Sequence, residues 1–124
     1  MTTSISLPFS TAECDEGPIA NCSPGRLTLR YDADGEYGTV WTRLEFNPAL
    51  ASRFTPDPAC DERMVHAYSR VDEDDDSRWI ADLRNSAKAN GAHLPASLRH
   101  FTVYFDHVGC WEVAADTMTI SPER

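Results

Sequence analysis

The sequence predicts an α+β fold in which an antiparallel sheet of four or five strands is covered on one face by one main helix. Two observations lead to this fold class. Two pairs of segments alternate apolar and polar residues, and each pair is joined by a short turn. Between the pairs lies one segment whose apolar residues recur at helical spacing. No repeat or linker divides the 124 residues, so we expect a single domain, 1–124.

The first pair of alternating segments lies in the N-terminal half. Residues 27–31 and 39–46 each place apolar side chains at every second position, as half-buried strands do. Residues 32–36 between them have turn composition, so a hairpin is expected. Residues 4–10 are expected to form an edge strand, because their proline cannot donate to a ladder. Residues 11–26 contain Gly-Pro and Pro-Gly pairs and are expected to form an ordered loop.

The middle of the chain, residues 47–71, gives weaker signals. Asp57 and Pro58 are expected to begin a helix, with Asp57 as its cap and the proline at the first helical position. The spacing of valine and alanine in residues 63–71 favours a strand over a helix.

The main helix is expected at about residues 77–90. The acidic run 72–76 precedes it, where carboxylates interact favourably with the positive end of the helix dipole and can cap free N–H groups. Gly91 follows the last periodic residue and is a suitable stop. The apolar stripe of this helix consists of Trp79, Ile80, Leu83 and Ala87.

The second alternating pair closes the chain. Residues 101–105 and 111–115 are expected to form a hairpin around the turn 107–109. Successive side chains of a strand point to opposite faces, so one set should face the main helix and the other should face solvent. The residues expected to face the helix are Phe101, Val103, Phe105, Trp111 and Val113.

The alternation changes parity near the end of this hairpin. Met118 and Ile120 fall on the opposite parity from Trp111. A bulge near Asp116 or Thr117 would allow all three apolar side chains to face inward.

Charge gives the strongest restriction on function. Twenty acidic and eleven basic residues leave a net charge of −9. This charge repels nucleic acid and anionic lipid, and it favours a basic protein as the partner. No apolar stretch reaches the roughly 20 residues of a membrane-spanning helix. The sequence contains no Cys-x-x-Cys pair and no Gly-rich phosphate loop, so no metal or cofactor is expected.

The partner-binding surface is expected to combine two features. The acidic run before the main helix can steer a basic partner into contact. An exposed tyrosine among carboxylates on the outward face of the second hairpin is typical of an interface anchor. The candidate partner-binding residues are Asp72, Glu73, Asp74, Asp75, Asp76, Tyr104, Asp106, Glu112 and Asp116.

The cysteines suggest a different class of function and bear on the compartment. Cys110, with His107 as base, could form a thiol nucleophile, which requires the two side chains to be adjacent. Reduced cysteines in a cytoplasmic protein are favoured, because the first residues lack a basic segment and a long apolar core. Cys14 and Cys22 flank a Gly-Pro turn and could bond if the protein were exported.

Residues 79–83, 94–95 and 100–115 together resemble the helix-then-hairpin tail of small bacterial immunity proteins of polymorphic toxin systems. The resemblance covers about a third of the chain and implies a cytoplasmic, non-catalytic inhibitor that occludes the active site of a toxin domain. One alternative stays open within the same mechanism, a phage-encoded acidic inhibitor such as an anti-CRISPR protein or nucleic-acid mimic. A subunit or scaffold of a larger assembly stays open as a separate class.

Overall fold

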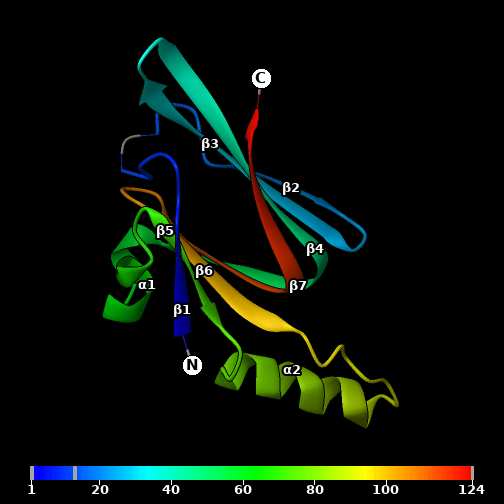
Figure 1. Ribbon diagram of the computed structural model, residues 1–124. Helices are drawn as coiled ribbons and strands as arrows, with labels where there is room; N and C mark the ends of the chain where they lie inside the picture. Colours follow the sequence, from blue (N-terminus) through cyan, green and yellow to red (C-terminus); the bar gives the residue numbers. More distant parts are fainter. Residues whose placement is uncertain (1, 13, 124) are drawn as a thin grey trace.

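The computed structural model describes residues 2–12 and 14–123 and corrects the expected fold class. Seven strands, not four or five, form one antiparallel sheet in the order β1-β5-β6-β7-β4-β3-β2 (Figure 1). The strands are β1 (Thr2–Ser6), β2 (Ile19–Ser23), β3 (Arg26–Gly35), β4 (Gly38–Pro56), β5 (Arg70–Asp74), β6 (Arg99–Phe105) and β7 (Gly109–Glu123); the helices are the 3-10 helix η1 (Asp57–Ala59), α1 (Glu62–His66) and α2 (Arg78–Ala89).

The sheet divides into two halves that share its two longest strands. β4 pairs with β3 over residues 38–46 and with β7 over residues 41–56. Of the residues of β7, only 109–115 pair with β6. We call β2, β3 and the strand segments beside them the β3 half, and β1, β5, β6 and the strand segments beside them the β6 half. β4 and β7 curve from one half into the other (Figure 1).

The main core lies between these halves. Tyr31 packs against Phe105 and Phe46 against Phe101, each pair with ring centroids 5.5 Å apart. The inner face of each half is therefore covered by the other half, and not by a helix. The core consists of Leu27, Leu29, Tyr31, Leu44, Phe46, Val71, Phe101, Val103, Phe105, Val113 and Ala115.

The helices pack on the outer face of the β6 half. Ala67, after α1, packs with Tyr104 and Cys110. Ile80 of α2 packs with Leu98 and Ala114. The expectation that Phe101, Val103, Phe105, Trp111 and Val113 face the main helix is thus wrong, because the helices cover the opposite set of side chains.

The main helix and both hairpins are confirmed. α2 is capped by Ser77, whose hydroxyl accepts a hydrogen bond from the N–H of Ile80 at 3.1 Å. It ends before Gly91, which has a φ of 77° and therefore suits glycine. Among the described residues, no helix is long and apolar enough to cross a membrane.

Several elements differ from expectation. β2 lies within residues 11–26, which were expected to form a loop. The sequence does not predict this strand, because its residues are mostly exposed and do not alternate between buried and exposed positions. Residues 63–66 belong to α1, with Asp61 as its cap, and the strand β5 begins only at Arg70. The helix expected from Asp57 is the three-residue η1, and its cap position is Pro56.

The parity change near the C-terminus has a different origin from the one expected. Met118 and Ile120 do pack against the main core with Trp111. However, the register shift between the two long strands lies in β4, between Ala49 and Ala51, and not at residues 116–117 of β7.

Candidate functional site

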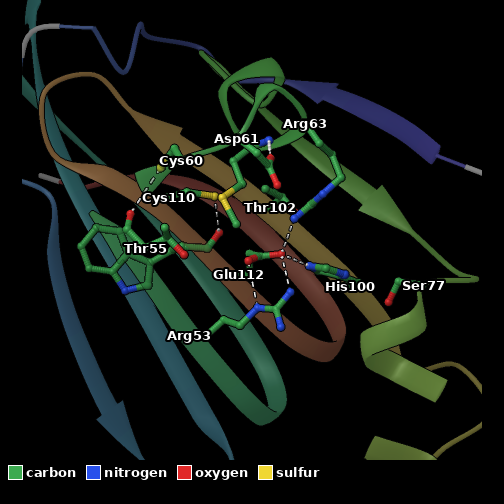
Figure 2. A network of polar contacts seen from close by, with 12 residues as sticks. Arg53, Thr55, Cys60, Asp61, Arg63, Ser77, His100, Thr102, Cys110 and Glu112 are labelled. Carbon is green, nitrogen blue, oxygen red and sulfur yellow. Dashed lines mark hydrogen bonds and ion pairs between the residues drawn. The ribbon is translucent and has the colours of Figure 1, made fainter. Parts of the chain in front are cut away.

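A buried carboxylate lies at the centre of the candidate site. Glu112 of β7 points to the outer face of the β6 half and is 0% exposed. Arg53, its register partner on β4, donates two hydrogen bonds to it, at 2.9 and 3.1 Å. Arg63 of α1 donates a third at 2.9 Å, and Nε2 of His100 lies 2.6 Å from Oε2 (Figure 2). Side chains from three elements, β4, α1 and β6, therefore converge on the carboxylate of β7, and we call these four residues the Glu112 cluster.

Electrostatics keep this carboxylate ionised. Burial alone would raise the pKa of Glu112, but hydrogen bonds from His100, Arg53 and Arg63 outweigh burial and hold the pKa below its ordinary value. An ionised carboxylate only accepts hydrogen bonds, so Nε2 of His100 carries the proton between them. The cluster is thus a satisfied ionic contact that ties α1 and β4 to the centre of β7.

Two surface hollows lie next to the cluster and share Arg63. The first has a volume of about 270 Å³ and is lined by Arg53, Arg63, Asp74, Asp76, Ser77, Arg78, Trp79 and His100. The second has a volume of about 470 Å³ and is lined by Thr2, Glu62, Arg63, His66 and Asp72.

The floor and rim of these hollows differ in character. The guanidinium of Arg53 lies 4.3 Å from the ring centroid of Trp79, and that ring packs against His100 at 4.9 Å. These contacts and the buried carboxylate make a fixed floor. Carboxylates of Glu62, Asp74 and Asp76 line the hollows from α1 and from the segment that enters α2, and we call these three residues the acidic rim.

The acidic run 72–76 is divided between buried and exposed positions. Asp72 is 8% exposed, accepts a hydrogen bond from Ser4 at 2.5 Å and lies 2.9 Å from Nδ1 of His66. Glu73 pairs with Arg99. Asp74 is half-buried and accepts from the N–H of Asp76, whereas Asp75 and Asp76 are exposed. Only the end of the run is therefore placed to meet a partner.

The candidates from the second hairpin do not form one surface with the acidic run. Tyr104 is 5% exposed and donates to Asp57, which raises the pKa of the phenol. Asp106 and Asp116 lie beyond opposite ends of the paired part of β6 and β7. The expectation that Tyr104 and Glu112 point to solvent is wrong, because α1, α2 and their connections cover that face.

Sequence reasoning missed Arg53, Arg63 and Trp79 as members of the site. One signal was available: the outward positions of the second hairpin hold Thr102, Cys110 and Ala114, which are small and uncharged. Such composition fits a face covered by other elements better than a solvated one. The identity of the covering residues carries no local signal, since Arg53 and Glu112 are 59 positions apart.

The geometry does not favour the thiol nucleophile. Cys110 is buried, and burial raises its pKa to about 12, with a further contribution from the charge of Glu112. His107 lies in the β6–β7 turn with its side chain 85% exposed, beside Asp106. Cys14 and Cys22 are both free, so the disulfide considered for them is not formed. Across residues 2–12 and 14–123, no group of three or more His, Cys, Asp or Glu side chains could hold a metal ion.

Comparisons with family models, with curated proteins and with solved structures find no match.

Proposed function

We propose that this chain is a non-catalytic binding protein that neutralises a basic protein, in the manner of an immunity protein that occludes the active site of a toxin domain. The docking surface in this proposal is the outer face of the β6 half around the two hollows, which we call the α1–α2 face. The observation that carries the proposal is the acidic rim: Glu62 of α1 lines one hollow, and Asp74 and Asp76 line the other, next to a fixed floor.

The distribution of ion pairs supports an acidic docking face. In the part of the chain that the structure describes, six arginines pair with only four carboxylates, because Glu112 and Glu123 each bind two. Positive charge is thus concentrated on a few acidic groups. The surplus of negative charge is left on other carboxylates, among them the acidic rim, where it can raise the association rate of a basic partner.

The Glu112 cluster has a supporting role in this proposal. It fixes Arg63, and with it α1, against β7, and it holds Arg53 under Trp79 of α2. A rim carried by anchored elements loses little conformational entropy on binding, which favours tight association. A cytoplasmic setting is part of the proposal and is consistent with four free cysteines.

The test compares two variants with equal change in net charge. The first reverses the rim with Glu62→Lys and Asp76→Lys. The control makes the same change with Asp34→Lys at the end of β3 and Glu36→Lys in the β3–β4 turn, both of which are exposed and outside these two hollows. The unaltered chain, immobilised, is used to capture partners from its own host, and the co-eluting protein is identified and produced.

We expect the captured protein to be basic, to be toxic when expressed alone, and to be neutralised by co-expression of the unaltered chain or of the control. The rim variant should bind it at least about tenfold more weakly. Equal loss of binding in both variants, or a partner with no activity that this chain inhibits, would contradict the proposal. A gene for the partner next to this one indicates a toxin–immunity pair, whereas a prophage setting indicates a phage inhibitor.

A further inference from the structure

The second part of β4 is an open strand edge. Ala49 and residues 51–56 pair with β7 on one side, with the register shift at Leu50, but β3 pairs with β4 only as far as Phe46. On the open side, the N–H of Ala49 donates to Gly25 in the β2–β3 turn at 2.9 Å. Within the described chain no strand pairs with the open side of residues 50–56. Such an edge can accept another strand through its free N–H and C=O groups.

Two large apolar side chains of this edge are exposed. Leu50 is 44% exposed and Phe54 is 45% exposed. One face of Phe54 packs on Trp111, with ring centroids 4.3 Å apart, which holds the ring in place. A shallow hollow of about 150 Å³ lies between the β2–β3 turn and Leu50.

The sequence of the edge is symmetric about Ser52. Pro48 and Pro56 stand four residues to either side, and Leu50 and Phe54 stand two residues to either side. In a two-fold symmetric pair of antiparallel strands, residues at equal distance from the axis are partners. An axis at Ser52 therefore places Phe54 of each copy opposite Leu50 of the other, beside its hollow. The prolines, which lack N–H groups, limit the paired segment at both ends.

Charge permits this contact in spite of the net charge of −9. The segment 47–56 contains no Asp or Glu, so the surplus carboxylates lie elsewhere. Its only charged residue is Arg53, whose guanidinium is already bound by Glu112. With the axis at Ser52, Arg53 lies opposite Ala51 of the other copy and not opposite a second arginine.

We propose that two copies of this chain form a homodimer by antiparallel pairing of their β4 edges, residues 50–54, with the two-fold axis at Ser52. The occupant of the edge is a second copy, because the pattern of Pro48, Leu50, Phe54 and Pro56 is complementary to itself. The proposal does not depend on the α1–α2 face or on any partner.

The axis position allows a charge-exchange test on the full chain. Ser52 is exposed and its hydroxyl has no hydrogen bond among the described residues, so Ser52→Lys and Ser52→Asp leave the fold intact. Each variant places two like charges opposite each other in the dimer only. The matched control is Thr119→Lys, the same kind of change on the open edge of β7 beyond residue 115.

Sedimentation equilibrium from about 1 µM to about 1 mM measures the dissociation constant. We expect the unaltered chain and the control to dimerise, each Ser52 variant to dimerise at least about tenfold more weakly, and an equimolar mixture of the two variants to recover dimers. Amides of residues 50–54 should exchange more slowly as concentration rises. The proposal is overturned if the unaltered chain is monomeric throughout this concentration range. It is also overturned if the Ser52 variants dimerise as tightly as the unaltered chain, or if their equimolar mixture does not recover dimers.

Discussion

Two glutamates of β7 bind arginine pairs in similar geometry but in different surroundings. Glu123 in the β3 half binds Arg30, with one hydrogen bond at 2.7 Å, and Arg43 at 3.3 Å. Glu112 in the β6 half binds Arg53 and Arg63 and has His100 as a third partner. In each cluster one arginine also lies over a tryptophan ring, at 4.8 Å for Arg30 over Trp41 and at 4.3 Å for Arg53 over Trp79.

Burial separates the two clusters. The side chain of Glu123 is 20% exposed, whereas that of Glu112 is 0% exposed beneath the α1–α2 face. Water can replace a lost partner at the first site, but it cannot reach the carboxylate at the second. The same combination of glutamate, two arginines and a tryptophan therefore gives a partly solvated ion pair in the β3 half and a structural anchor in the β6 half.

The largest expected effect comes from neutralising each glutamate. We expect Glu112→Gln to lower the free energy of unfolding by about 3 kcal/mol, because it leaves cationic partners around a buried neutral group. Glu123→Gln should lower it by about 1 kcal/mol or less, as for other partly solvated pairs. Urea denaturation of both variants measures the difference. Equal losses would show that burial does not separate the two clusters.

The pH dependence of stability tests whether Glu112 is ionised in the folded chain. The pKa of Glu112 is lowered in the folded state, so the unfolded chain binds a proton at higher pH than the folded chain does. Its contribution to stability is complete above the ordinary value of 4.5 and is lost as the pH falls below that value. We expect Glu112→Gln to unfold with a shallower dependence on pH in this range. An unchanged slope, measured by urea denaturation at successive pH values, would contradict the assigned ionisation.

An effect smaller than that of Glu112→Gln is expected from the tryptophans that cover the arginines. Trp79→Leu should lower the free energy of unfolding by about 1–2 kcal/mol, because Trp79 covers Arg53 and packs against the buried cluster of Ile80, Leu98 and Ala114. Trp41→Leu should cost about 0.5 kcal/mol, since Trp41, unlike Trp79, is not packed against a buried apolar cluster of the described residues and loses mainly its contact with Arg30. The two variants are compared by thermal and urea denaturation. A larger loss for Trp41→Leu would reverse the comparison.

The spacing of apolar residues predicted those helices and strands that depend on residues close together in the sequence. The apolar stripe of α2, its position before Gly91 and the alternation in both hairpins all depend on neighbours within a few residues. β2 and β5 lack such patterns. β5 includes Asp72 and Glu73, whose carboxylates are accommodated by His66 and Arg99 from elsewhere in the chain.

The candidate site could not be predicted because it depends on what covers each face of the sheet. Alternation separates Phe101 from His100, but it does not show that the β3 half covers the first and the helices cover the second. The alternation alone therefore predicts that polar residues such as Tyr104 and Glu112 are exposed to solvent. The register between β4 and β7, which brings Arg53 to Glu112, is set by packing across the whole sheet.

Hydrogen exchange of the chain with and without its captured partner tests the docking surface most directly. We expect protection on binding in residues 61–66 and 74–80, which carry the acidic rim, and unchanged exchange at the β3–β4 turn, residues 35–38. Protection confined to that turn or to the β3 half, with residues 61–66 and 74–80 unchanged, would contradict the proposal that the α1–α2 face binds the partner.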